Sequence, residues 1–507
     1  MTQWPGNPTI YEINTWVWLG DLSRRYSRPI TLDSVPDEEW DALAGLDFDA
    51  VWLMGVWERS PLGRQIAAET PELVAEFRRV LPDYTDEDNV GSPYCVHRYR
   101  VDPDLGGPTG LALARRALAS RGMKLVLDYV PNHVALDHPV TSEHPEFFIR
   151  GDESDLEQDP NGFFKVEDKV IARGRDPNFP PWPDVAQLNA YSPDLRRWVI
   201  DTVSSIADQC DGMRCDMAML MMTDIFRRTW GNRGGEAPST EFWPEVIGAV
   251  KRRNPDVVFF AEAYWDLEYD LQQQGFDYCY DKRLYDRLAH EDAESVRGHL
   301  RAALDYQTRL LRFTENHDEP RAAATFIPAG KERAAAIFAT TLPGARLLHQ
   351  GQLSGKRTRI PVFLRRGPEE PADQSHMQAY RSLLRGIKAC GGLRDDWSLC
   401  NVRGWPDNQS CRNLTAWAWS KGDTLTALII VNYADTRSQG IVELPPGSTG
   451  DRTWWLADMF SAETFTRDGH QMIEQGMYVE LEAWGIHFLQ ATPMTNSGLV
   501  ESIATAA

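Results

Sequence analysis

The chain has 507 residues, of which 42% are hydrophobic and 25% charged, and its formal net charge is -21. This length exceeds what one hydrophobic core supports, so we expect two or three domains of a soluble globular protein. The negative charge argues against a nucleic-acid partner, because a polyanion would be repelled.

Neither a membrane span nor a secretion signal is visible in the sequence. No apolar run approaches about 18 residues, and the first residues lack a basic segment followed by an apolar core. The seven cysteines are scattered and show no C-x-x-C spacing, which favours thiols in a reducing compartment. We therefore expect a cytoplasmic protein with no membrane partner.

Eight short apolar runs alternate with amphipathic helical stretches between residue 8 and about residue 390. The runs are TIYEIN (9–14), AVWLMGVW (50–57), MKLVLDYV (123–130), GMRCDM (212–217), VVFFAEAY (257–264), FDYCYD (276–281), LLRFTENHD (310–318) and ARLLHQG (345–351). Continuous β-branched and aromatic runs are typical of parallel strands that are buried on both faces. Helices are expected at 108–122 and 192–209, the second with Ser192 as N-cap and Pro193 as its first residue.

This alternation predicts a (β/α)8 barrel, with a doubly wound open sheet as the alternative. We assign residues 1–133 and 190–392 to the barrel. Residues 134–189, rich in Pro, Asp and Gly, form a long insertion after the third strand, which we interpret as a subdomain at the active-site end.

After about residue 395 the pattern changes to antiparallel strands. Residues 413–433 predict a hairpin with a turn at 421–423, and residues 477–490 show partial alternation of apolar side chains. We assign 393–493 to a C-terminal β-sandwich domain and 494–507 to a flexible tail.

Ionisable and polar residues recur where the expected strands end. Asp128, Asn132 and His133 follow the third strand, Arg214 and Asp216 lie in the fourth, and Glu262 ends the fifth. Asn316, His317 and Asp318 end the seventh. Because the carboxyl ends of barrel strands meet at one mouth, we expect the three acids Asp216, Glu262 and Asp318 to face a common cavity.

The segment GMRCD (212–216) places two opposite charges in an apolar strand. Residues two apart in a strand share a face, so Arg214 is expected to contact Asp216 and lower its pKa, leaving an ionised nucleophile. Glu262 lies in an apolar run that raises a carboxyl pKa, as a general acid requires. One ionised and one protonated carboxyl group are what retaining cleavage of a glycosidic bond needs.

Each of these features also occurs in proteins without catalytic activity. The Arg214–Asp216 pair and Glu262 could be structural ion pairs, and the segment 316–318 could be a capped turn. His133 and His317 could bind a metal together with neighbouring acids, as in a metal-dependent barrel hydrolase. Four strands that end in this way, in order, favour the catalytic interpretation.

Together these segments resemble the signature motifs of the α-amylase family, glycoside hydrolase family 13. DYVPNH (128–133), GMRCD (212–216), FAEAY (260–264) and TENHD (314–318) resemble its four signatures in order. VAQLN (185–189) resembles the motif that closes the inserted subdomain, and SPYCVHRYRVDPDLGG (92–107) resembles the segment with a stacking tyrosine.

The resemblance implies roles for the catalytic acids. Asp216 would be the nucleophile that forms a β-glycosyl-enzyme intermediate, and Glu262 would protonate the leaving oxygen and then activate the acceptor. Asp318 would hold sugar hydroxyls and favour the oxocarbenium-like state. Arg214 would orient Asp216.

The resemblance also implies substrate-binding residues. His133 and His317 would hydrogen-bond the innermost sugar, Tyr94 would stack under its ring, and Asp128 would organise the pocket. The position of Asn132 ligates a structural calcium in some members of the family, whereas the chemistry itself would need no cofactor.

Three departures, at four positions, distinguish this sequence from the pattern of the family. Met219 and Leu220 stand where many starch-degrading members have Lys-His, and we expect these apolar side chains to line the acceptor side. Arg98 replaces a common Asp, and Leu353 replaces Glu in a Gly-Gln-Glu motif. None of these departures removes a catalytic group.

The first hypothesis is a retaining enzyme that hydrolyses α-glucosidic bonds of oligosaccharides or small α-glucosides. The alternatives are a transglycosylase or a phosphorolytic glucosyl or maltosyl transferase on the same site, and a non-catalytic interaction protein of the same fold. The sequence leaves the linkage, chain length, acceptor and oligomeric state open.

Overall fold

The computed structural model describes residues 3–494, and its central feature is a closed barrel of eight parallel strands. Neighbouring strands follow the order β1-β15-β14-β13-β12-β11-β5-β2. The strands are β1 (Thr9–Asn14), β2 (Ala50–Met54), β5 (Lys124–Tyr129), β11 (Gly212–Cys215), β12 (Val258–Ala261), β13 (Tyr278–Tyr280), β14 (Leu310–Arg312) and β15 (Ala345–His349). Each lies within one of the eight runs expected from the sequence, so the barrel is confirmed and the open sheet is wrong.

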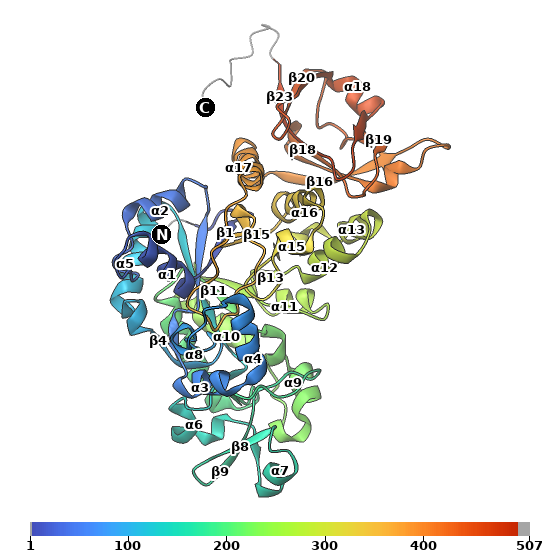
Figure 1. Cartoon of the computed structure of the whole chain (residues 1–507). Coiled ribbons are helices and arrows are strands. Elements are labelled where there is room, and N and C mark those ends of the chain that lie inside the picture. The colour runs from blue at the N-terminus through green and yellow to red at the C-terminus, as the bar shows by residue number, and fades with distance from the viewer. Residues whose placement is uncertain (1–2, 495–507) are drawn as a thin grey trace.

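Helices follow the strands and cover the outside of the barrel (Figure 1). The longer ones are α1 (Thr15–Arg25), α2 (Asp37–Ala44), α3 (Pro61–Glu69), α4 (Pro71–Val80), α5 (Gly107–Ser120), α8 (Pro193–Ala207), α9 (Thr223–Trp230), α10 (Phe242–Arg253), α12 (Lys282–His290), α13 (Ala293–His299), α16 (Ala329–Thr341) and α17 (Gln374–Ala389). The Ser192 side chain accepts a hydrogen bond from the backbone amide of Leu195, and Pro193 is the first residue of α8, as expected. Every helix within residues 3–494 is too short or too polar to cross a bilayer.

The barrel interior is narrow at the start of β11. A Cβ atom added at Gly212 would lie 3.1 Å from both Trp4 and Phe260, so only glycine fits here without displacing a ring. The register of β11 then places Arg214 beside Asp128 of β5 and Phe260 of β12. The fold therefore brings the charged residues of two neighbouring strands to the same level of the barrel.

The insertion after β5 has its own small sheets. β6 (His133–Ala135) pairs antiparallel with β10 (Val185–Gln187), and β7 (Arg150–Gly151), β9 (Lys169–Ala172) and β8 (Phe163–Val166) form a three-stranded sheet. Short helices α6 (Val140–Glu143) and α7 (Glu153–Gln158) flank it. The two ends of the insertion thus meet beside the barrel mouth, although the exact domain boundaries stay a prediction.

Eight antiparallel strands form the C-terminal part, in the order β21-β20-β23-β18-β17-β16-β19-β22. They are β16 (Asp396–Arg403), β17 (Leu414–Lys421), β18 (Thr424–Asn432), β19 (Ser438–Glu443), β20 (Thr453–Asp458), β21 (Thr464–Asp468), β22 (Met477–Leu481) and β23 (Ile486–Pro493). The expected hairpin is confirmed, since β17 and β18 join at Gly422. The run 477–490 divides into two strands, β22 and β23.

The C-terminal sheet and the sheet at 150–172 lie at opposite ends of the molecule (Figure 1). The indoles of Trp417 and Trp419 both donate to the carbonyl of Thr341, at 3.2 and 2.9 Å, and so attach the C-terminal sheet to helix α16. The predicted tail falls, apart from Met494, outside the described residues.

Candidate active site

Two of the three expected acids, Asp216 and Glu262, meet around Arg214 at the C-terminal ends of the barrel strands. Its Nη1 lies 2.8 Å from Asp216 Oδ1 and its Nη2 lies 2.8 Å from Glu262 Oε2. Nη1 is also 3.7 Å from Asp128 Oδ1. One buried guanidinium therefore faces three carboxyl groups, so the site holds more negative than positive charge.

The turn after β11 explains how Glu262 reaches this cluster. Met217 has a left-handed backbone (φ +40°), which ends the strand and directs its N–H to Glu262 Oε2 at 2.6 Å. The hydroxyl of Tyr264 donates to Glu262 Oε1 at 2.9 Å. The carboxyl group of Glu262 is thus fixed from both sides.

The pKa of Glu262 fits a general acid. Burial raises it from 4.5 to about 7, and the charges of Asp216 and Asp318 act in the same direction, whereas Arg214 lowers it. A carboxyl group with this pKa is protonated up to neutral pH and can also act as a base.

The expected lowering of the Asp216 pKa is wrong. Burial is the largest effect and raises the pKa of Asp216, and Asp318 and Asp128 raise it further, so Arg214 only offsets part of the increase. Arg214 divides its charge between Asp216 and Glu262 instead of pairing with Asp216 alone.

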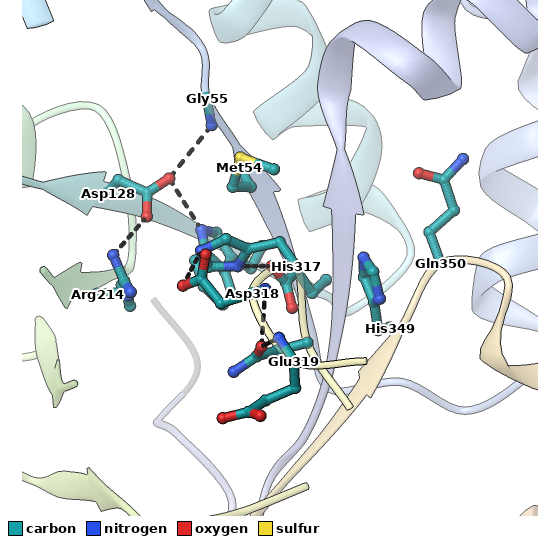
Figure 2. A network of polar contacts seen from close by, with 12 residues as sticks. Met54, Gly55, Asp128, Arg214, His317, Asp318, Glu319, His349 and Gln350 are labelled. Carbon is teal, nitrogen blue, oxygen red and sulfur yellow. Dashed lines mark hydrogen bonds and ion pairs between the residues drawn. The ribbon is translucent and has the colours of Figure 1, made fainter. Parts of the chain in front are cut away.

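A second cluster lies on the other side of the mouth, around His317 (Figure 2). Its Nε2 is 2.6 Å from the hydroxyl of Tyr94 and 3.0 Å from Asp318 Oδ2, and its Nδ1 is 2.5 Å from Glu12 Oε1. Desolvation by the surrounding protein raises the pKa of Asp318, but the His317 imidazolium outweighs this effect and the pKa falls to about 2. The side chain of Asp318 is 44% exposed, so an ionised carboxylate faces the mouth.

The Asp128 carboxyl group supports the pocket from beneath. Its Oδ2 accepts hydrogen bonds from the indole of Trp52 (3.1 Å) and the amide of Gly55 (3.2 Å). Figure 2 shows it between Gly55 and Arg214. These contacts fix the carboxyl group in place, while its organising role toward a substrate stays a prediction.

His133 is engaged within the protein. Its Nε2 lies 3.2 Å from the carbonyl of Tyr94 and its Nδ1 lies 3.3 Å from Asn132 Nδ2. Burial lowers the pKa of His133 to about 4, so the ring is neutral and its Nε2–H donates to Tyr94. His133 thereby fixes the backbone of Tyr94, while the contacts of both residues with a sugar stay a prediction.

The structure also brings in residues that sequence reasoning missed. Glu12 of β1 contacts His317, Trp52 of β2 contacts Asp128, and the Tyr280 hydroxyl of β13 lies 3.4 Å from Arg214 Nε. A signal existed for Glu12, because it is the one acid in the apolar run TIYEIN.

Met219 and Leu220 are buried. They lie in a short 3-10 turn, Ala218–Met221, and are only 0% and 2% exposed, within the main hydrophobic core. Their contact with an acceptor stays a prediction. Arg98 is exposed on β4 (Val96–Val101), and Leu353 is half-buried beside Gln352, whose amide donates to Thr314 and Tyr380.

The residues around Asn132 do not fit a calcium ion. Asn132 Oδ1 accepts from Gln187 Nε2 at 2.9 Å, and its Nδ2 lies 3.2 Å from Gln187 Oε1, so the two amides satisfy each other. Calcium prefers several oxygen ligands, carboxylates among them. Within residues 3–494 no three or more His, Cys, Asp or Glu residues are placed to hold a metal ion.

The fold thus places a carboxyl pair bridged by arginine at the end of the (β/α)8 barrel where the active sites of such barrels lie. The family model for the catalytic domain of α-amylase matches residues 38–381. The chain belongs to the α-amylase family, as its motifs predicted.

Individual relatives are distant. The chain is 28% identical to an α-amylase of Haloarcula japonica over 375 residues, which are 70% of this chain and 45% of that protein. It is 23% identical to an α-1,4-glucan:maltose-1-phosphate maltosyltransferase of Picrophilus torridus over 206 residues, 39% of this chain and 28% of that protein. The chain thus spans less than half the length of these two relatives.

Solved structures show the same fold. A noncanonic maltogenic α-amylase of Thermotoga neapolitana superposes with a TM-score of 0.68 at 18% identity, covering 97% of this chain and 99% of that one. The superposition includes the C-terminal sheet as well as the barrel, since nearly the whole of each chain is matched.

Proposed function

We propose that this protein is a retaining enzyme that hydrolyses α-glucosidic bonds of oligosaccharides or small α-glucosides. The observation that carries the proposal is the bridge formed by Arg214 between Asp216 and Glu262, which have different environments at adjacent strand ends. Family membership and the names of the relatives support the same class of reaction.

In the first step, Asp216 attacks the anomeric carbon while Glu262 gives its proton to the departing glycosidic oxygen. The bond between the sugar and the leaving group breaks, and a β-glycosyl ester of Asp216 forms. Arg214 contacts both carboxyl groups and so compensates the charge that moves from Asp216 to Glu262.

In the second step, the ionised Glu262 removes a proton from water, which attacks the anomeric carbon and releases Asp216. Two inversions restore the α configuration. Asp318, ionised beside His317, is placed to accept hydrogen bonds from sugar hydroxyls and to stabilise positive charge on the ring.

Transfer to another acceptor is the second candidate, because it differs only in what attacks the intermediate. The maltosyltransferase relatives favour it. A non-catalytic interaction protein is the remaining alternative, and the retention of all three acids at the barrel mouth argues against it.

The deciding experiment incubates the protein with maltose, maltooligosaccharides, trehalose, sucrose and isomaltose, with and without phosphate, and follows products by NMR. The proposal expects a product that first appears as the α anomer. An initial β anomer would contradict double displacement, glucosyl or maltosyl phosphate would indicate phosphorolysis, and no turnover of any substrate would favour the interaction protein.

We also propose that the protein acts in the cytoplasm. All seven of its cysteines are buried, unpaired thiols, as is usual in a reducing compartment. Cell fractionation followed by immunodetection tests this location, and recovery from the culture medium would contradict it.

A further inference from the structure

The side chain of Glu12 is a buried carboxyl group that the mechanism above does not use. It is 0% exposed, on β1, and the strand register places it between Trp52 of β2 and His349 of β15. Its Oε1 lies 2.5 Å from His317 Nδ1, whereas its Oε2 has no hydrogen-bond partner within the described chain. A buried carboxyl group with a single partner is costly, so its presence in the barrel points to a role.

The contacts of His317 point to a ring that carries two protons. Nδ1 faces a carboxyl oxygen of Glu12, and Nε2 faces a carboxyl oxygen of Asp318 at 3.0 Å. A neutral imidazole has one N–H, so one of its nitrogens would present a lone pair to a carboxyl oxygen. An imidazolium donates from Nδ1 to Glu12 and forms an ion pair with Asp318, while its Nε2 lies 2.6 Å from the Tyr94 hydroxyl.

Other ionisable groups surround this ring from neighbouring elements. The Tyr94 hydroxyl lies 2.6 Å from Nε2, and the charge of His317 acts on Asp128 of β5. On the side of β15, a small crevice contains His317 together with Arg321, His349, Lys356 and Arg359. Of these cations, Arg321 lies 2.6 Å from Glu315 and Arg359 lies 2.6 Å from Glu76, so acids outside the crevice offset both.

We propose that Glu12 is a positioning residue that keeps His317 doubly protonated, so that the imidazolium charge holds the Asp318 carboxylate toward the substrate. Glu12 acts through Nδ1 of the ring and does not touch the sugar. Above its pKa of about 2, Asp318 then stays fixed at every pH at which His317 keeps its second proton. The inference rests on the proposed function only where activity is measured.

Burial and charge agree with this geometry. Burial alone lowers the pKa of His317, but Asp318 and Glu12 outweigh it and the pKa lies well above the ordinary value of 6.5. Removal of the Glu12 charge therefore lowers the pKa of His317, and the ring loses its second proton at a lower pH than in the natural protein.

The first test measures kcat/KM of Glu12→Gln and of the natural enzyme between pH 5 and 9. The ratio of the two values is compared across this range, because the titration of Glu262 affects both enzymes and cancels in the ratio. We expect a ratio that falls by about tenfold or more as the pH rises, because one pKa unit corresponds to a tenfold change in population. Glu12→Asp keeps the charge, so its ratio should be reduced but independent of pH. A flat ratio for Glu12→Gln would overturn the proposal.

Glu332→Gln is the matched control. Glu332 is also a buried glutamate, 1% exposed, with an unpartnered Oε2 and a histidine nearby, His376 at 3.8 Å, but it lies on helix α16 outside the barrel. Its loss should affect stability in a similar way while leaving the ratio flat. A falling ratio in this variant as well would show that the effect follows from lost stability and would contradict the proposal.

The second test needs neither substrate nor a folded Glu12 variant. Two-bond ¹H–¹⁵N spectra of histidine-labelled protein report both ring nitrogens of each of the 11 histidines, and a His317→Gln sample identifies the signals of His317. We expect both nitrogens of His317 to be protonated at pH 8. A neutral ring at pH 8 would overturn the proposal even if the protein proved inactive on every α-glucoside.

Discussion

On one side of the barrel mouth, three carboxyl groups share one guanidinium. Arg214 lies 2.8 Å from Asp216 and Glu262 and 3.7 Å from Asp128. The pKa values of all three carboxyl groups are raised, with burial as the main cause.

On the other side, two carboxyl groups enclose one imidazolium. Desolvation again raises the pKa of Asp318, yet the positive charges of His317, Arg214 and Arg359 bring it to about 2. Several cations therefore act on the half-exposed Asp318, whereas the three buried carboxyl groups on the other side share Arg214 as their contacting cation. The Arg214 side is suited to proton transfer and the His317 side to holding a permanent negative charge.

Among these variants, Asp216→Asn should lower activity the most, because the amide cannot form the glycosyl ester. We expect kcat to fall by about 10⁴-fold or more with an unchanged thermal melt. Asp211→Asn, just before the same strand, is the control and should keep activity within about twofold. If Asp216→Asn were as active as the natural enzyme, Asp216 would not be the nucleophile.

Glu262→Gln should cost less, about 10²- to 10⁴-fold in kcat, and should change the pH profile. Glu262 works as a protonated acid with a pKa of about 7, so kcat/KM of the natural enzyme falls as the pH rises through 7. The variant should lose this alkaline limb. Aryl glucosides with good leaving groups should be less impaired than maltose, and equal impairment would contradict the role of Glu262 as an acid.

Asp318→Asn tests whether the charge of Asp318 on one side of the mouth affects the pKa of Glu262 on the other. The charge of Asp318 raises the pKa of Glu262, so its removal should move the alkaline limb of the residual activity to lower pH, by less than about one unit. Glu319→Gln removes a neighbouring charge that lies 3.2 Å from Lys282 and should leave the limb in place. A shift to higher pH in Asp318→Asn would refute the coupling.

Met219→Ala tests the burial that raises the pKa values on the Arg214 side. Met219 is 0% exposed, so its truncation leaves a cavity in the core, and we expect a loss of about 2–5 kcal/mol in the free energy of unfolding. Urea denaturation measures it. An unchanged stability together with altered acceptor preference would place Met219 at the acceptor side after all.

Chelation should have the smallest effect. The two sides of the mouth were compared by their side-chain charges alone, and a metal cation beside Asn132 would add a positive charge to this balance. Because Asn132 is satisfied by Gln187, we expect EDTA to change the melting temperature by less than about 1 °C. A decrease of several degrees that calcium reverses would establish the metal site.

The sequence by itself determined the barrel and the order of the motifs, and it singled out Asp216, Glu262 and Asp318 as the predicted catalytic acids. Strands that are buried on both faces have continuous apolar runs, and a charged residue at the end of such a run is conspicuous, as in GMRCD and FFAEAY. Both signals are local along the chain. The exact ends of the strands could not be predicted as well from the sequence, since β12 ends at Ala261 and β14 at Arg312, before the polar residues that follow.

Only the tertiary structure decided which charges meet. Glu12 and His317 are 305 residues apart, and Arg214 contacts Glu262 across a strand boundary, so neither pairing is visible from spacing. The pKa of Asp216 depended on burial and on two further carboxyl groups, which is why a single neighbouring arginine misled the prediction. Burial of Met219 and Leu220 likewise follows from a left-handed turn at Met217 that no apolar pattern specifies. Electrostatic and packing energies depend on distances in space, and the fold alone sets those distances.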